Sequence, residues 1–385
     1  MRLRTAALAA TTVLGTGAAT LAAGRYAADA ALRPPRPRGD AGSGPTAGFE
    51  GTRLTVHSHD DGSIAVTRSL AANLPGVYGL TGRGVHAVVG PVLTDATAAQ
   101  PRPHAVVREL RRVDRGRLST GTTVRLTPQV YVGDPGEALG TAYADAEIPG
   151  ELGPLPAWFV PGDRGVWVIA VHGLGATREH PLALVPFYRR FSVPVLDLAY
   201  RGDPGAPPHP DGIGHLGNSE WRDLDAALRY AVQHGARRVI LHGWSSGATM
   251  ALHTAANSPL RDRVAGLVLD SPVLDWPATV RALAASRGTP RALLPLVVRA
   301  VQGRAGLPEG RDVAVVDSAK LAVPTLVLHG PDDTVAPVDS SRALAARRPR
   351  LISLREIPDA PHAAMWNADP HGYEEALRRF ITPLI

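Results

Sequence analysis

The chain has no cysteine, and only one of its 41 basic residues, Lys320, is a lysine. The absence of cysteine excludes a thiol nucleophile, disulfides and thiolate metal sites. It leaves the cellular compartment open. The arginines give a net charge of +6. They are scattered rather than clustered with aromatic residues, which make up only 5% of the chain, so the charge does not predict a nucleic-acid partner.

A length of 385 residues with 44% hydrophobic content is enough for one large domain and an accessory one. The composition predicts a globular protein. The high content of arginine, alanine, glycine and proline is typical of the codon bias of a GC-rich genome. The sequence shows no internal repeat of the kind that builds solenoids or propellers.

Charged residues are absent from Thr5 to Gly24, directly after two arginines. This stretch predicts a signal peptide or a single membrane anchor within residues 1–32, with Ala28-Asp29-Ala30 as a cleavage candidate. Arginines on both sides of the stretch give opposing orientation signals. We favour export, which places the protein at the cell membrane, tethered through residues 5–24, or outside the cell.

Residues 33–48 read "RPPRPRGDAGSGPTAG", a composition typical of an exposed linker. Residues 49–144 then contain short runs such as "RLTVHS", "SIAVTRS" and "HAVVGPVL" between Gly, Pro and Asp residues. They predict a β-rich accessory segment, to which the sequence assigns no role. Within it, "HSHDDG" is expected to be a turn with surface side chains rather than a metal site.

Residues 145–385 alternate between apolar runs and amphipathic stretches. The predicted strands are "AWFVP", "VWVIAVHG", "VPVLDLAYRG", "RRVILHGWS", "VAGLVLDSP", "VPTLVLHGPDD" and "LISLREIPDAPH". Helical stretches such as "SEWRDLDAALRYAVQHG" and "YEEALRRFI" separate them. This alternation predicts an α/β fold, with a mainly parallel sheet covered by helices on both faces. A site is expected at the carboxyl ends of the strands.

The segment "GWSSG" places Ser245 between two glycines at a predicted turn from strand to helix. Such a G-x-S-x-G turn presents the serine hydroxyl as a nucleophile. Three other predicted strands end in "HGLG", "HGPDD" and a segment that leads into "DAPH". Along the chain the order is therefore Ser245, an aspartate and His362, which is the order found in α/β hydrolases.

On these motifs, with "DLAYRGDPG", "SEWRDLDAALRY" and "PHAAMWNADPHGYEEAL", residues from about 150 to 385 resemble the α/β-hydrolase superfamily. Within it they are similar to the serine-aminopeptidase-like and esterase or thioesterase branch. The resemblance does not extend to the first 140 residues. The chain departs from the expected "YRGxGxS" segment, where "YRGDPGAPPHPDGIGHLGNSE" carries a longer, proline-rich insertion that changes the shape of the pocket.

The chemistry assigns a role to each group. His362 would take the proton of Ser245 as general base, and Asp333 would orient the imidazole. The backbone N–H groups of Leu174 and Ser246 would form the oxyanion hole. The alternatives are Ser246 as the nucleophile and Asp332 or Asp270 as the acid. We expect Asp270 instead to cap the segment "SPVLDW", and we expect His172 to brace its loop.

Trp244, Trp276 and Trp366 lie in or next to the predicted catalytic loops, either lining an apolar acyl pocket or packing in the core. The long insertion at about residues 276–315 predicts a small helical lid. We predict a serine hydrolase without cofactor or metal that cleaves an ester, thioester or amide bond of a small-molecule or peptide acyl substrate. The alternative is a catalytically silent hydrolase fold that binds a partner at the membrane.

Overall fold

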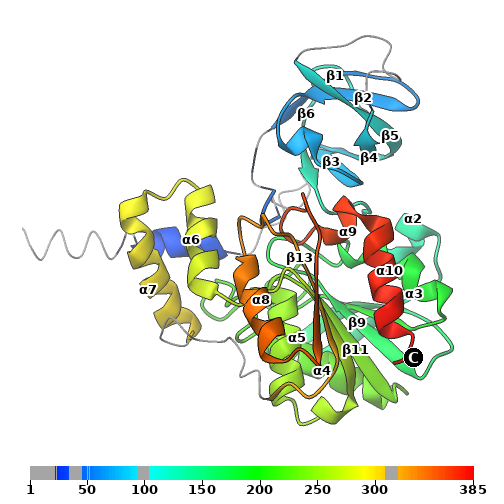
Figure 1. Ribbon diagram of the computed structural model, residues 1–385, viewed down its shortest axis with the longest axis vertical. Coiled ribbons are helices and arrows are strands. Elements are labelled where there is room, and N and C mark those ends of the chain that lie inside the picture. Colours follow the sequence, from blue (N-terminus) through cyan, green and yellow to red (C-terminus); the bar gives the residue numbers. More distant parts are fainter. Residues whose placement is uncertain are drawn as a thin grey trace, which may run out of the picture.

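The computed structural model describes residues 22, 24–33, 46–49, 51, 53–93, 104–307 and 320–385. They form a closed β-barrel, a larger sheet covered by helices, and a group of helices at one side (Figure 1).

The barrel is built from six antiparallel strands in the order β1-β2-β5-β4-β3-β6. These are β1 (Leu54–His59), β2 (Ser63–Thr67), β3 (Tyr78–Gly82), β4 (Val85–Val92), β5 (Ala105–Arg115) and β6 (Thr123–Thr127), with a short 3-10 helix at Ala71–Asn73. Apolar residues such as Ile64 and Leu80 fill its interior. The barrel confirms the predicted β-rich N-terminal segment, and Asp60 forms the expected turn by accepting the Gly62 and Ser63 amides at 3.0 and 2.7 Å.

One arginine, Arg108, is fully buried in the barrel. Its guanidinium donates hydrogen bonds to the carbonyls of Gly90, Ala72, Leu74 and Gly76 at 2.6 to 3.0 Å. Burial lowers the pKa of Arg108 to about 10, so the group stays charged at neutral pH. A buried charge is tolerated only when its donors are satisfied, and here four backbone carbonyls satisfy them.

The larger sheet has eight strands in the order β14-β13-β12-β11-β9-β10-β8-β7. Their bounds are β7 (Ala144–Gly150), β8 (Gly153–Val160), β9 (Val166–Val171), β10 (Val195–Leu198), β11 (Arg238–Trp244), β12 (Val264–Asp270), β13 (Thr325–His329) and β14 (Ile352–Glu356). The six strands β9 to β14 are parallel, whereas β8 runs antiparallel to β10 and β7. The predicted mainly parallel sheet is therefore confirmed.

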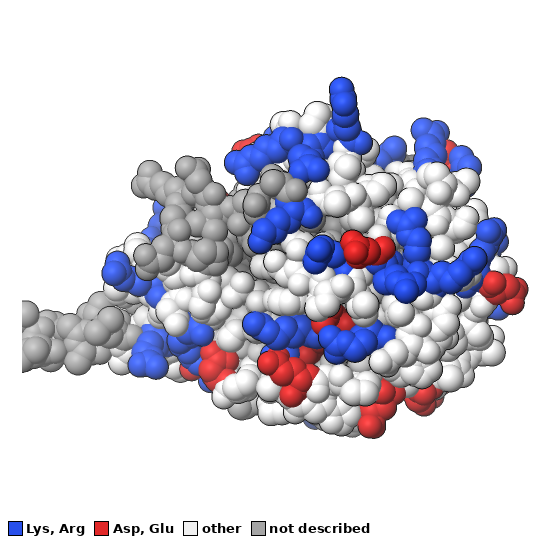
Figure 2. All heavy atoms as spheres, turned by 90° about the horizontal axis from the view of Figure 1, so that it is seen from below, with Lys and Arg blue, Asp and Glu red and all other residues white. Residues whose placement is uncertain are grey.

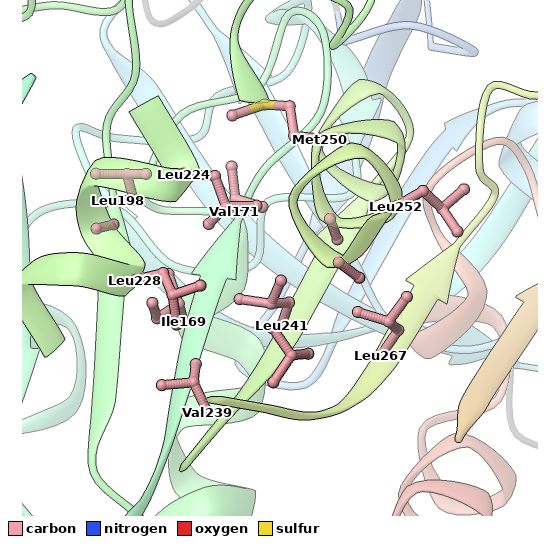
Figure 3. Packing of buried hydrophobic residues seen from close by; sticks show 14 of the residues in the cluster. Ile169, Val171, Leu198, Leu224, Leu228, Val239, Leu241, Met250, Leu252 and Leu267 are labelled. Atoms are coloured by element: carbon pink, nitrogen blue, oxygen red, sulfur yellow. The ribbon is translucent and has the colours of Figure 1, made fainter. Parts of the chain in front are cut away.

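Helices cover both faces of this sheet. They are α2 (Pro135–Leu139), α3 (Val185–Arg190), α4 (Trp221–Gln233), α5 (Ser246–Asn257), α8 (Val338–Arg347), α9 (Met365–Ala368) and α10 (Pro370–Ile381), with 3-10 turns at Pro181–Leu184, Arg261–Arg263 and Arg291–Leu293. On one face Leu224 of α4 and Met250 of α5 pack on Ile169 and Leu241 of the strands (Figure 3). On the other face α3 and α10 contribute residues such as Phe187 and Leu377.

Two further helices, α6 (Trp276–Ser286) and α7 (Leu294–Ala305), stand beside the sheet with a helix formed by residues 24–32 (Figure 1). Ala28, Ala31 and Leu32 of that helix are buried with Val280 and Val301 of the other two. Residues 24–32 are therefore packed against protein. The segment thus supplies core side chains, and the signal peptide or anchor within residues 1–32 stays a prediction.

The rest of the predicted membrane segment, residues 5–21 and 23, lies outside the described residues and stays a prediction. Among the helices that the structure describes, none is long and apolar enough to span a bilayer. At the end of the predicted linker, Thr46 and Ala47 are buried, and residues 34–45 lie outside the described residues. Over the face seen in Figure 2, basic side chains form separate groups with acidic side chains among them.

Candidate active site

Ser245 lies at the turn between β11 and α5 in a conformation that side chains rarely adopt, with φ +52° and ψ −117°. The two glycines of the motif allow this turn because the backbone is crowded there. A Cβ on Gly243 would lie 2.3 Å from the Gly247 carbonyl oxygen, and a Cβ on Gly247 would lie 2.3 Å from that of Val171. The sequence pattern thus has a steric cause, and the strained turn presents the Ser245 hydroxyl.

The structure brings Ser245, His362 and Asp333 together although they are far apart in the sequence. His362 Nε2 lies 2.7 Å from Ser245 Oγ, and His362 Nδ1 lies 2.7 Å from Asp333 Oδ2. All three side chains are almost completely buried. The imidazole therefore bridges a hydroxyl and a carboxylate, as proton transfer from the serine requires.

Asp333 is held as a carboxylate. Burial alone would raise its pKa, but the nearby His362 charge and hydrogen bonds from His329 and His362 lower the pKa well below its usual value. Its Oδ1 also accepts the amides of Val335 and Ala336 at 2.8 and 2.9 Å. Asp333 thus has fixed donors on both oxygens, which fix the carboxylate in front of His362.

Asp270, the rival acid, lies at the end of the neighbouring strand β12. Its Oδ1 accepts a hydrogen bond from the Ser271 hydroxyl at 2.9 Å, and its Oδ2 has no hydrogen-bond partner among the described residues. Burial raises the pKa of Asp270 to about 7. The expectation that Asp270 caps the following segment is wrong: Asp275 caps α6 by accepting the Ala278 amide at 2.9 Å.

Of the two predicted oxyanion donors, Ser246 follows Ser245 in the chain and Leu174 follows Gly173. Within the part of the chain that the structure describes, neither the Leu174 amide nor the Ser246 amide donates a hydrogen bond to another residue. Ser246 is the first residue of α5, where amides point along the helix axis without intrahelical acceptors. Gly173 approaches the nucleophile so closely that a Cβ there would lie 2.6 Å from Ser245 Cβ.

His172 braces the loop that carries Leu174, as predicted from the sequence. Its Nε2 lies 2.8 Å from Asp203 Oδ2, its Nδ1 lies 3.0 Å from the Gly173 carbonyl oxygen, and its ring stacks on Tyr200. The sequence does not predict that Asp203 is the partner of His172. The signal was present in the motif "YRGDPG", but the pairing spans 31 residues and only the folded sheet shows it.

Residues Arg178, Glu179 and His180 have structural contacts. Arg178 lies over the Trp158 ring at 4.0 Å, and Glu179 accepts hydrogen bonds from the Gln129 side chain and the Gly133 amide. His180 is buried, and burial lowers its pKa to about 3, which keeps it neutral. The run therefore ties the loop after β9 to the segment that leaves the barrel.

The three tryptophans lie in different places. Trp276 is buried in the cluster of α6, α7 and helix 24–32, together with Leu174 and Val335 from the two catalytic loops. Trp244 instead packs on the opposite face of the sheet and stacks on His242 at 4.1 Å. Trp366 donates to Glu374 at 3.2 Å beside α10. Of the three pocket candidates, only Trp276 lies with the loop residues next to the triad.

Comparisons with known proteins agree with this architecture. Residues 166–289 match the family described as alpha/beta hydrolase fold. The chain therefore has the α/β-hydrolase fold. Residues 55–127, which span the barrel, match a family described only as a domain of unknown function (DUF8805). Among curated proteins, none matches the chain.

Solved structures share the fold at low sequence identity. An esterase from Pyrococcus furiosus is 21% identical, with a TM-score of 0.54 over 66% of this chain and 95% of that chain. A second crystal form of it gives a TM-score of 0.53 and 19% identity over 67% and 98% of the two chains. An esterase from Thermogutta terrifontis is 21% identical over 63% and 99%, with a TM-score of 0.46. These similarities extend over about two thirds of the chain.

Proposed function

We propose that this α/β hydrolase cleaves a carboxylic ester, thioester or amide through an acyl-enzyme on Ser245. The observation that carries the proposal is the continuous set of contacts from Ser245 Oγ through the His362 ring to Asp333, with 2.7 Å at each step. The name of the Pyrococcus furiosus esterase that shares the fold supports the same class of reaction.

In the first half-reaction Ser245 Oγ attacks the substrate carbonyl carbon, and its proton passes to His362 Nε2. The carbonyl oxygen becomes an oxyanion between the amides of Leu174 and Ser246. The bond to the leaving group then breaks, and His362 returns the proton to that group. In the second half-reaction water attacks the acyl ester, gives a proton to His362, and releases the acid with Ser245 restored.

The apolar cluster beside the triad favours an acyl group with hydrocarbon character. Leu174 and Val335 border the oxyanion and acid loops, and Leu216, Val273 and Trp276 continue the same cluster. Because α6 and α7 provide the far side of this cluster, we also propose that they act as a lid over the acyl group. In this proposal Trp276, at the start of α6, contacts the acyl chain.

A fluorophosphonate probe tests the proposed function directly. The wild-type chain should be labelled, and Ser245→Ala should lose the label, because the probe reacts only with an activated serine. Ser246→Ala is the matched control, since that hydroxyl lies next to the nucleophile and should leave labelling intact. A folded wild type that is never labelled would favour a catalytically silent binding module.

A further inference from the structure

A second group of chemistry-bearing residues lies in the proline-rich loop between β10 and α4. His209, Asp211 and His215 each direct one nitrogen or oxygen atom toward the others, and these atoms lie within 4.8 Å of one another. His209 is buried, Asp211 is exposed and His215 is intermediate. The group therefore has a protein-enclosed side and a side open to solvent.

His209 has one nitrogen without a protein partner. Its Nδ1 is buried and makes no hydrogen bond among the described residues. Its other nitrogen, Nε2, lies 3.5 Å from Glu220 Oε1. A neutral imidazole that carries its proton on Nε2, toward this carboxylate, has its lone pair on Nδ1.

His215 has the matching arrangement. Its Nδ1 lies 2.9 Å from Ser219 Oγ, and the Ser219 hydroxyl is directed at Glu220 Oε2 at 3.4 Å. Its Nε2 lies 3.0 Å from Asp211 Oδ2. With its proton on Nδ1, His215 would donate a hydrogen bond to Ser219 Oγ, and the Ser219 hydroxyl would donate to Glu220. The lone pair on His215 Nε2 then lies on the same side as the Asp211 carboxylate.

We propose that His209 Nδ1, His215 Nε2 and Asp211 Oδ2 bind a divalent transition-metal ion, with Zn²⁺ as the preferred ion. Two imidazole nitrogens and one carboxylate oxygen are a ligand set that Zn²⁺ accepts, and they leave a fourth position for water. Ligating histidines commonly give their second N–H to a carboxylate, directly or through another group. Glu220 takes this role for both histidines here.

The charges around the loop permit a cation. Arg304 Nε lies 3.9 Å from Asp211 Oδ2, but the same guanidinium is paired with Asp29 and donates to the Asp211 carbonyl oxygen at 2.8 Å. Asp29 and Asp211 thus share the Arg304 guanidinium, and Glu220 adds a further carboxylate beside His209. A second arginine, Arg201, forms ion pairs with Asp223 and Glu151.

The position of the loop gives the ion a structural consequence. The Gly214 amide donates to the Leu32 carbonyl oxygen at 2.9 Å, and the Asn218 side chain donates to the Ala305 carbonyl oxygen at 3.0 Å. The loop thus holds both helix 24–32 and the end of α7. A bound ion would stiffen the attachment of these helices without touching the triad.

Calorimetric titration of the tag-free, chelator-treated full chain with Zn²⁺ tests the proposal. We expect one Zn²⁺ per chain, a rise in Tm with Zn²⁺, and a Co²⁺ absorption spectrum typical of nitrogen and oxygen ligands. His215→Ala and Asp211→Asn should each weaken Zn²⁺ binding at least tenfold. Glu220→Gln should weaken it by about 10- to 100-fold, as expected for a group that supports the ligands.

His371→Ala is the matched control, because that exposed histidine lies in α10 and outside the loop. Its affinity for Zn²⁺ should equal that of the wild type. Asp211→Asn is the variant least apt to disturb folding, and circular dichroism of the metal-free variants checks that each is folded. Less than one Zn²⁺ per chain, or an affinity that Asp211→Asn and His215→Ala leave unchanged, would overturn the proposal.

Discussion

Two buried aspartates at the ends of neighbouring strands have pKa values shifted in opposite directions. Asp333 accepts hydrogen bonds from two histidines and two amides, and its pKa is lowered. Asp270 has Ser271 as its side-chain donor, and its pKa is raised to about 7 by burial. The charge of His362 and the hydrogen bonds to Asp333 offset the burial that raises the pKa of Asp270, and they account for the opposite shifts.

Asp333→Asn should lower kcat by about 10³- to 10⁴-fold with little change in substrate binding. The amide would hold His362 in the wrong tautomer for accepting the Ser245 proton. Asp270→Asn, in a parallel assay, should retain most of its kcat. Circular dichroism must show that both variants are folded. If Asp270→Asn were the inactive variant and Asp333→Asn nearly normal, the assignment of the acid would be wrong.

The pKa of Asp270 predicts a pH-dependent difference in stability. A carboxyl group whose pKa rises from about 3.9 in the unfolded chain to about 7 in the fold stabilises the fold below pH 4. This contribution is lost as the pH rises toward 7. The amide in Asp270→Asn cannot ionise, so this variant should not lose that stability as the pH rises.

Denaturant unfolding at several pH values measures this effect. The free energy of unfolding of Asp270→Asn should approach that of the wild type near pH 4. At pH 8 the variant should be the more stable by up to about 4 kcal/mol, at about 1.4 kcal/mol for each pKa unit. A difference between the two proteins that does not change with pH would contradict the raised pKa.

The sequence alone predicts Ser245, His362 and Asp333 as site residues, because each lies in a short motif that follows an apolar strand. It did not reveal that Asp275 rather than Asp270 caps α6, since both aspartates precede a helical stretch and only the backbone geometry distinguishes them. Of the two roles that the sequence leaves open for Trp244, pocket lining or core packing, the fold favours packing, because its side chain lies in the core on the face of the sheet covered by α3 and α10.

At the scale of elements, helix 24–32 completes the packing of α6 and α7. Leu32 is fully buried, Asp29 pairs with Arg304, and the Arg287 guanidinium donates to the Ala31 carbonyl oxygen. The three helices form one cluster, to which the sheet contributes little. The lid proposed over the acyl group therefore includes a segment from the beginning of the chain.

Deletion of residues 1–44 should destabilise the protein and speed hydrogen exchange in α6 and α7, whereas deletion of residues 1–21 should not. The longer deletion removes Leu32, whose burial alone contributes about 1.5–3 kcal/mol, and exposes the apolar sides of both helices. The composition of residues 33–48 predicts an exposed linker, and on that interpretation the residues before it could be removed without effect on the fold. Equal Tm values for the two truncated proteins would restore that interpretation.

The apolar periodicity of the sequence predicted all strands from β8 to β14 but not β3, β5 or β7. Strand β7 reads "ADAEIPG", in which a single large apolar residue, Ile148, is buried, so its pattern is weak. The sequence does not predict that helix 24–32 belongs to the core, because of the composition of this segment. An alanine-rich stretch next to uncharged residues resembles the end of a membrane segment until its partners in α6 and α7 are known.

At the scale of the whole molecule, the barrel packs on the segment that follows His362, the proposed general base. Asn367 of α9 donates to the carbonyls of Val77 and Pro128, both at 2.9 Å, and the Val77 amide donates to the Asn367 carbonyl oxygen at 2.8 Å. Gly76 fits this contact because it has no side chain: a Cβ there would lie 2.0 Å from the Asn367 carbonyl oxygen. The barrel therefore supports the loop of His362 from outside the sheet.

Asn367→Ala should lower the free energy of unfolding by about 2–4 kcal/mol, because two buried carbonyls lose their donor. Hydrogen exchange should increase around residues 359–364, and turnover should fall with it. Asn73→Ala is the control, since the Asn73 side chain donates to the exposed Ser69 carbonyl within the barrel. Equal stability of the two variants would mean that the barrel does not brace the histidine loop.

The contacts of helix 24–32 also set an order of events during synthesis. Its partners Arg287 and Arg304 lie 256 and 275 positions later along the chain, so most of the protein must be made before they exist. Contacts at such a separation form late and slowly. Helix 24–32 is made long before its partners and is thus among the last elements to dock, and until then its buried side chains have no partners in the fold.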